Sequence, residues 1–141
     1  MDTRFEPRLI EAALRARDNA RPDYSRFHVG AALEDADGRV HAGCNVESAS
    51  YGLTICAERT ALFRAIADGA SAFRRLVVVG DSGGTPTPPC GACRQVLYDF
   101  CGPDLEILLL DTGGARRYFH LRDLLPEPFH AGLLKPPPAS L

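Results

Sequence analysis

Residues 76–79 read Leu76-Val77-Val78-Val79, an unbroken apolar run of strand length. A strand that is apolar at every position, rather than at alternate ones, is typical of the interior of a sheet with both faces covered. We expect another buried strand from Glu106 to Leu110, in which every residue after Glu106 is apolar. We therefore expect an α/β fold, a three-layer α/β/α sandwich with one mixed, mostly five-stranded sheet.

The segments around these two strands supply the helices and the remaining strands. Apolar residues at helical spacing, with Pro or Gly near the ends, predict helices from Pro7 to about Asn19, about Cys56 to Asp68, Gly91 to about Phe100 and Leu121 to Leu125. Short apolar runs predict strands at Val29–Leu33, Val40–Cys44 and Tyr118–His120. The turn Asp37-Gly38 should join the first two as a β-hairpin. The second helix is expected to be largely buried, through Ala57, Ala61, Leu62, Ala65 and Ile66.

The length and charge of the chain limit its class. The 141 residues suit one compact domain, which we expect over residues 1–134, followed by a disordered tail at residues 135–141. A formal net charge of -2 without a basic block argues against a nucleic-acid partner. No apolar run reaches the roughly 18 residues of a membrane span, and the N-terminus does not resemble a signal peptide. We therefore expect a cytoplasmic protein with no membrane partner.

Five cysteines are an odd number in a chain with no recognisable export signal, which favours metal or redox chemistry over a disulfide framework. Cys90 and Cys93 are three residues apart, so a helix places both thiols on one face, within reach of one ion. Cys56 opens another predicted helix and is a natural third ligand. Free N–H groups at a helix start favour the thiolate form.

The number of ligands separates a catalytic zinc site from a structural one. A structural site closes its tetrahedron with four protein ligands, whereas a catalytic site leaves one position for water. Cys101 lies about 12 Å further along the helix than Cys93, which is too far for a fourth ligand. Cys44 ends a predicted strand and stays an open alternative. His41, His120 and His130 are expected to be surface or packing residues, which leaves three convincing ligands for Zn²⁺.

Glu58 lies two positions after Cys56, where a carboxylate can reach a water on the metal without binding the metal. Taken alone, Glu58 also fits a simple acidic residue in a first helical turn. Arg59 and Arg94 stand next to the cysteines, and three thiolates around Zn²⁺ leave the site negative. We hypothesise that one or both arginines donate hydrogen bonds to the sulfurs and restore some of the metal's acidity.

At these residues the chain resembles the small zinc-dependent cytidine deaminases. The zinc signature of that family is matched by Cys56-Ala57-Glu58-Arg59 and by Pro89-Cys90-Gly91-Ala92-Cys93-Arg94-Gln95. Further matching segments are Tyr24-Ser25, Phe27, Val29-Gly30-Ala31-Ala32, Gly43-Cys44-Asn45-Val46-Glu47, Ala49-Ser50-Tyr51-Gly52, Leu124-Leu125-Pro126 and Phe129. The resemblance thus covers most of the chain.

The resemblance implies hydrolytic deamination of cytidine and 2′-deoxycytidine to the uridines with release of ammonia, as a step of pyrimidine salvage. It implies that Cys56, Cys90 and Cys93 hold Zn²⁺ and that Glu58 carries protons between water and the cytosine ring. Substrate contacts carry over to Phe27 as an aromatic wall, Asn45 and Glu47 at the ribose 3′-hydroxyl, Ala57, and Phe129. In the family's homotetramer the residue matching Phe129 reaches a neighbouring subunit's site.

Other interpretations remain open at this point. Asp23 and Ser48 depart from the family's usual Pro and Asn, and Asp23-Tyr24-Ser25 is also similar to deaminases of the nucleoside antibiotic blasticidin S. Asn45 and Glu47 also fit plain turn residues. A non-catalytic, zinc-stabilised binding module would need a fourth ligand. A nucleic-acid base editor would need a basic groove and more aromatics, and a Cys90–Cys93 redox pair leaves Cys56 and Glu58 without a role.

Overall fold

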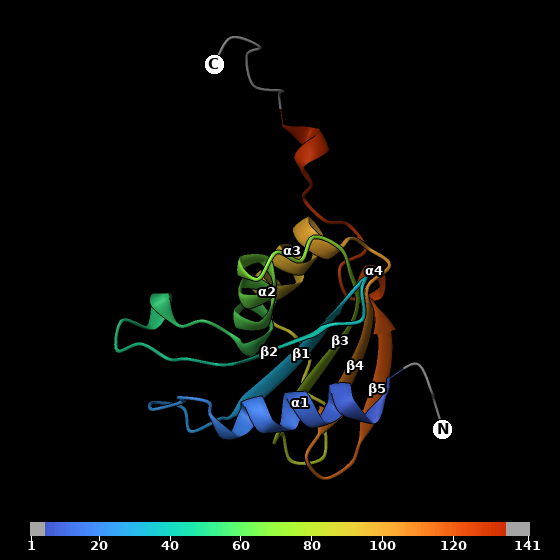
Figure 1. The fold of residues 1–141 in the computed structure, drawn as a ribbon. Helices are drawn as coiled ribbons and strands as arrows, with labels where there is room; N and C mark the ends of the chain where they lie inside the picture. The colour runs from blue at the N-terminus through green and yellow to red at the C-terminus, as the bar shows by residue number, and fades with distance from the viewer. Residues whose placement is uncertain (1–4, 135–141) are drawn as a thin grey trace.

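The computed structural model describes residues 5–134, which form a five-stranded sheet between helices (Figure 1). In chain order the elements are α1 (Pro7–Asp18), β1 (Val29–Asp35), β2 (Val40–Cys44), the 3₁₀ turn η1 (Tyr51–Leu53), α2 (Ala57–Ala67), β3 (Phe73–Gly80), α3 (Gly91–Cys101), β4 (Glu106–Asp111), β5 (Arg116–His120), α4 (Leu121–Leu124) and the 3₁₀ turn η2 (Ala131–Leu133). Within the described part of the chain, no helix is long and apolar enough to cross a membrane.

The sheet is mixed, with the strand order β2-β1-β3-β4-β5. β3 and β4 are parallel, and every other neighbouring pair is antiparallel. The run Leu76 to Val79 lies in the central strand β3, where all four residues are buried. The predicted α/β/α sandwich is therefore confirmed, and the apolar run is the centre of its sheet.

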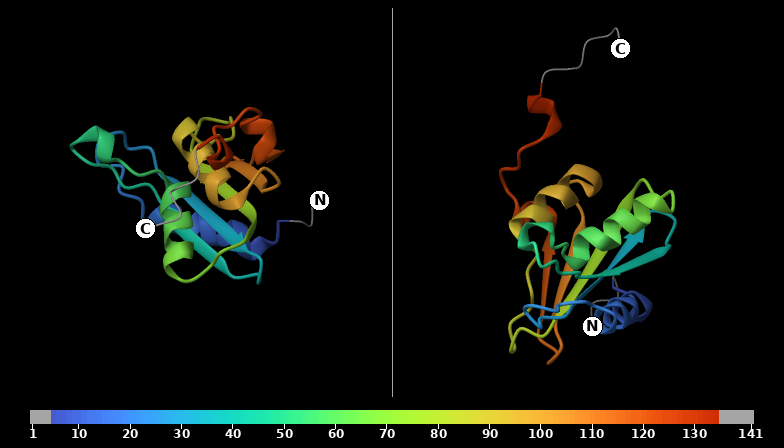
Figure 2. Two further views of the ribbon diagram at one scale, coloured as in Figure 1. Left: turned by 90° about the horizontal axis from the view of Figure 1, so that it is seen from above. Right: turned by 90° about the vertical axis from the view of Figure 1, so that its left-hand side faces the viewer.

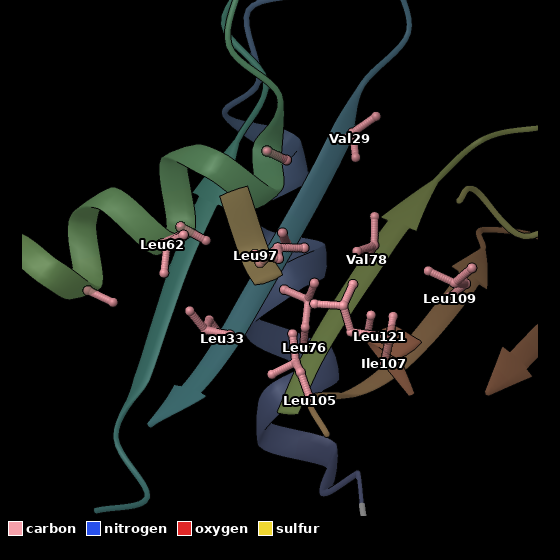
Figure 3. Packing of buried hydrophobic residues seen from close by; sticks show 14 of the residues in the cluster. Val29, Leu33, Leu62, Leu76, Val78, Leu97, Leu105, Ile107, Leu109 and Leu121 are labelled. Carbon is pink, nitrogen blue, oxygen red and sulfur yellow. The ribbon is translucent and has the colours of Figure 1, made fainter. Parts of the chain in front are cut away.

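Helices cover both faces of the sheet. α1 lies on one face, while α2 and α3 lie on the other (Figure 1 and Figure 2). Alternate residues of each strand point into two separate cores. On the α2 and α3 side, Figure 3 shows Leu62 and Leu97 packed over side chains of the sheet. The core under α1 comprises Phe5, Leu9, Ala13, Ala32, Val77, Val79, Leu108 and Leu110.

Two glycines allow helices to lie close against the hairpin strands. A Cβ atom on Gly30 of β1 would lie 2.0 Å from the carbonyl oxygen of Ala13 in α1. A Cβ atom on Gly43 of β2 would lie 2.3 Å from the backbone nitrogen of Ala61 in α2. Any side chain at either position would push a helix away from the sheet. The position of α2, and so of the residues at its start, depends on Gly43.

The helix and strand predictions are confirmed to within a few residues at each end, but two details differ. Ile66 is predicted on the buried face of α2, yet it is 38% exposed, because the buried face of this helix consists of Ala57, Glu58, Ala61, Leu62 and Ala65. The turns η1 and η2 were not predicted; three residues are too few for a periodic pattern. The predicted tail at residues 135–141 lies outside the described residues.

Candidate functional site

Three thiols meet where α2 and α3 begin. Cys56 is the residue just before α2, Cys90 is the residue just before α3, and Cys93 lies in the first turn of α3. The Sγ atom of Cys90 lies 3.7 Å from that of Cys56 and 3.5 Å from that of Cys93. All three sulfurs lie within 4.8 Å of one another, and they form the metal-ligand cluster found among residues 5–134. The structure thus brings together the three predicted ligands.

The spacing of the sulfurs fits one zinc ion. Sulfurs bound at about 2.3 Å in a tetrahedron lie about 3.8 Å apart, close to the observed separations. The pKa of Cys56 is lowered to about 5, first by a hydrogen bond with the Cys93 thiol and then by Arg59. The same hydrogen bond, together with burial, raises the pKa of Cys93. The cluster therefore already holds a thiolate at neutral pH, which is the form that binds zinc.

The two other cysteines and His41 lie outside the sulfur cluster. Cys44 is not part of the sulfur cluster, and its carbonyl oxygen accepts a hydrogen bond from Thr60. Cys101 is at the far end of α3, where burial raises the pKa of its thiol to about 12. His41 is buried against Asp35, with 2.9 Å between Nε2 and Oδ2. No fourth sulfur or imidazole closes the cluster among the described residues.

The two arginines that follow the cysteines have different partners. Arg59 donates from Nη2 to the Sγ atom of Cys56, at 3.4 Å. Arg94 donates instead to two carbonyl oxygens, those of Pro89 and Leu124, each at 2.8 Å. The hypothesis that one or both arginines contact a sulfur thus has structural support for Arg59. Arg94 therefore links the residue before Cys90 to the end of α4, and neither of these hydrogen bonds goes to a sulfur.

Glu58 lies in the first turn of α2 beside the sulfur cluster, and its side chain is almost completely buried (4% exposed). Burial raises the pKa of this carboxyl to about 7, and the charge on Cys56 contributes to the rise. The positive end of a helix dipole favours the ionised form of a carboxyl, so the pKa of an ordinary exposed acid in a first turn would not be raised. Glu58 can therefore take up and release a proton near neutral pH.

A cavity of about 240 Å³ opens beside Glu58 and the thiols. The side chains around it come from the start of β1, the segment after β2, the start of α2 and the segment before α3. They are Phe27, Val29, Asn45, Glu47, Thr54, Cys56, Ala57, Glu58, Thr87, Pro88 and Cys90. Five residues expected to contact a substrate or move its protons, Phe27, Asn45, Glu47, Ala57 and Glu58, thus line one cavity.

Asn45 and Glu47 are both held firmly at the cavity. The amide of Asn45 accepts from the backbone N–H of Val29 at 2.9 Å and donates to the carbonyl of Phe27 at 2.7 Å. The carboxylate of Glu47 accepts from the backbone N–H groups of Tyr24 and Ser25 and from the Ser25 hydroxyl. These bonds, first that of the Ser25 hydroxyl, lower the pKa of Glu47. Glu47 is therefore an anion at the cavity wall at neutral pH.

Phe129 is separate from this cavity. Its side chain is 58% exposed, and its carbonyl oxygen accepts a hydrogen bond from Gln95 of α3. It belongs to the segment that ends in η2 and projects away from the sheet (Figure 1). Within one chain, Phe129 does not line the cavity that contains Glu58.

Sequence reasoning missed four cavity-lining residues, namely Val29, Thr54, Thr87 and Pro88. Thr87-Pro88 directly precedes the cysteine motif, and this adjacency was the only available signal. Thr87 also packs on the end of β3, because a Cβ atom on Gly80 would lie 2.5 Å from Thr87 Oγ1 and 3.0 Å from Cζ of Phe27. Gly80 thus makes room for two walls of the cavity.

Comparison with known proteins gives consistent matches. Residues 4–108 match the family described as the cytidine and deoxycytidylate deaminase zinc-binding region. The chain is 48% identical over 123 residues to a cytidine deaminase of Halalkalibacterium halodurans, which covers 87% of this chain and 92% of the relative. It is 44% identical over 122 residues to a cytidine deaminase of Sporosarcina psychrophila, which covers 86% of this chain and 89% of the relative.

Solved structures agree with the sequence comparison. The crystal structure of a cytidine deaminase from Burkholderia pseudomallei superposes with a TM-score of 0.83 at 52% identity, covering 86% of this chain and 97% of that one. A cytidine deaminase from Mycobacterium tuberculosis gives a TM-score of 0.75 at 42% identity, covering 86% of this chain and 94% of that one. The observed fold is thus the fold of these enzymes.

Proposed function

We infer the function from the fact that this chain belongs to the cytidine and deoxycytidylate deaminase family, which has a zinc-binding region. The chain is a zinc-dependent hydrolytic deaminase, and we propose that it converts cytidine and 2′-deoxycytidine to the corresponding uridines with release of ammonia. One observation carries the proposal: the buried Glu58 lines a cavity together with Cys56 and Cys90 of the thiol cluster.

We propose that Cys56, Cys90 and Cys93 hold the zinc ion. Their sulfurs are close enough together, and Cys56 is already a thiolate at neutral pH. Zinc, when bound, lowers the pKa of water and so makes a nucleophile available at neutral pH. Arg59 contributes a positive charge 3.4 Å from the Cys56 sulfur and so offsets the charge of the thiolates.

Glu58 is proposed to move protons during the reaction. Replacing the amino group at C4 of cytosine by oxygen requires proton removal from water and proton delivery to the ring nitrogen N3 and to the leaving amine. A carboxyl with a pKa of about 7 suits both tasks, because it is neither fully ionised nor fully protonated at neutral pH. Its burial keeps bulk water away from the proton path.

We propose that the cavity selects nucleosides over nucleotides. The ring of Phe27 forms an apolar wall suited to a flat base. Asn45 and Glu47, in the segment after β2, also line the cavity, and we propose that they bind the ribose 3′-hydroxyl. Because Glu47 is held in its anionic form, a substrate phosphate would be repelled electrostatically, whereas a sugar hydroxyl can donate a hydrogen bond to it.

A homotetramer that shares its sites between subunits is proposed as the working form. Two segments project from the sandwich, one around η1 and one ending in η2 (Figure 1). Their large apolar side chains are exposed, as is usual for surfaces that contact another chain: Tyr51, Leu53, Phe129, Leu133 and Leu134. We propose a cytoplasmic enzyme of pyrimidine salvage, with free nucleosides rather than nucleic acid as its substrates.

The test is an ultraviolet absorbance assay of the purified protein with cytidine, 2′-deoxycytidine, cytidine 5′-monophosphate and blasticidin S. We expect turnover of the first two, at least about tenfold lower kcat/KM with the monophosphate, and loss of activity when a chelator removes zinc. Light scattering of the same preparation should give the mass of four chains. Turnover of the nucleotide at the nucleoside's rate would contradict the placement of Glu47, and turnover of blasticidin S alone would contradict the substrate.

A further inference from the structure

The segment from Asp81 to Pro88 connects β3 to the cysteines of α3 and forms part of the cavity wall through Thr87 and Pro88. It contains neither helix nor strand. Gly83 and Gly84 both have positive φ angles, 70° and 99°, which are conformations that other residues rarely adopt. A loop with this much backbone freedom needs fixed attachment points if Thr87 is to stay in one place.

Asp111 provides such an attachment point from the neighbouring strand. It is the last residue of β4, is 4% exposed, and pairs in register with Gly80 at the end of β3. Its Oδ1 atom accepts a hydrogen bond from the backbone N–H of Ser82, at 2.8 Å. Its Oδ2 atom accepts from the backbone N–H of Gly113, also at 2.8 Å. One buried carboxylate thus joins the loop after β3 to the turn after β4.

The attachment continues from Ser82 to the cavity. The hydroxyls of Ser82 and Thr87 hydrogen-bond each other across the loop. The side chain of Thr87 in turn rests on Gly80 and lies beside the ring of Phe27. An unbroken set of contacts therefore leads from Asp111 through Ser82 and Thr87 to the wall of the cavity.

We propose that Asp111 is a positioning residue for the substrate, which fixes the loop from Asp81 to Pro88 so that Thr87 and Pro88 complete the pocket beside Phe27. This inference rests on the proposed function, because it concerns the same cavity. Asp111 touches neither the sulfur cluster nor the cavity, so its effect is on substrate binding rather than on zinc.

Asp35 offers a matched control. It is also a buried aspartate at the end of a strand, and it also accepts backbone N–H bonds, from Asp37 at 2.9 Å and Arg39 at 3.0 Å. The register pairs Val29 with Gly80 and Asp35 with Phe73, so Asp35 lies at the opposite end of the sheet from Asp111. Asp35→Ala should therefore weaken a loop of the same kind without affecting the cavity.

The experiment measures kcat and KM for cytidine, zinc content, and amide hydrogen exchange of residues 81–88 in three variants. Loss of a charged hydrogen-bond acceptor should raise KM about five- to tenfold in Asp111→Ala, with zinc content unchanged and faster loop exchange. Asp111→Asn keeps one carbonyl acceptor but sets an NH2 group against the other backbone N–H, so its KM should lie between those of the wild type and Asp111→Ala. Asp35→Ala should leave KM at the wild-type value.

Ser82→Ala provides a second variant should Asp111→Ala fold poorly, because Ser82 is exposed and only its contact with Thr87 is lost. Its KM should rise about two- to fivefold. If Asp111→Ala and Ser82→Ala, or whichever of them folds, have the KM of the wild type, the inference is overturned. It is also overturned if Asp35→Ala raises KM as much as these variants do. A wild-type protein that does not turn over cytidine would contradict the proposed function instead.

Discussion

Glu58 and Arg59 lie two and three positions after Cys56, and the helix turns their side chains toward different surroundings. Glu58 is buried beside the cavity, and burial raises its pKa to about 7. Arg59 reaches the Cys56 sulfur, and the hydrogen bond to that thiolate raises the pKa of the guanidinium, which therefore stays charged. Adjacent residues can thus serve proton transfer and charge compensation separately.

Arg59→Ala should weaken zinc binding about tenfold, because loss of a partner that orients and neutralises a metal ligand typically costs 10- to 100-fold in affinity. The measurement is competition for zinc against a chromophoric chelator. Arg64→Ala is the matched control, since Arg64 lies on the same helix and donates to the carbonyl of Ala42 rather than to a sulfur. Equal zinc affinity in the two variants would exclude this role of Arg59.

Whole elements bring the site residues together. α2 and α3 lie on the same face of the sheet, and each has a cysteine as the residue just before its first turn. Their free N–H groups and positive dipole ends therefore point toward the same cluster of sulfurs. At the opposite end of the sheet, the hairpin of β1 and β2 is fixed by Asp35, which binds two backbone N–H groups, Arg39 and His41.

The hairpin should lose stability in acid because of Asp35. Its hydrogen bonds, first that with His41, lower its pKa in the folded protein from 3.8 to about 2. A lowered folded-state pKa means that the stabilisation is complete above about pH 4 and is lost as the pH falls toward 2. In urea unfolding, the difference in unfolding free energy between wild type and Asp35→Asn should therefore shrink between pH 4 and pH 2. A difference that stays constant over this range would contradict the assignment.

At the scale of the whole molecule, local sequence patterns were enough to predict the fold. They predicted only some of the residues that line the cavity. The run from Leu76 to Val79 predicted the central strand because a strand that is buried on both faces needs an apolar side chain at every position. The proximity of Cys56 and Cys90 was predictable because three thiols at helix starts indicate ligands of one metal ion. Thr87 carried no such signal, since its place depends on Gly80 of β3 lying beneath it.

Asp111 shows the same limit. In the sequence it is a polar residue before a glycine turn, a pattern that indicates only a loop. Its contact with Ser82 joins residues 29 positions apart through a parallel strand pair, and such pairing is set by the packing of the whole sheet. The contact between Arg94 and Leu124 was likewise unpredictable, because the end of α4 approaches Arg94 only in the folded molecule.

The central claim is that Glu58 carries protons for a zinc-dependent deamination. The most direct measurement is kcat of Glu58→Gln with cytidine. The zinc content and the unfolding free energy of the variant are first shown to equal those of the wild type. Glu11→Gln, on the exposed face of α1, is the control. We expect kcat to fall about 10²- to 10⁴-fold in Glu58→Gln and to stay unchanged in Glu11→Gln. A folded, zinc-loaded Glu58→Gln protein that deaminates cytidine at the wild-type rate would contradict the claim.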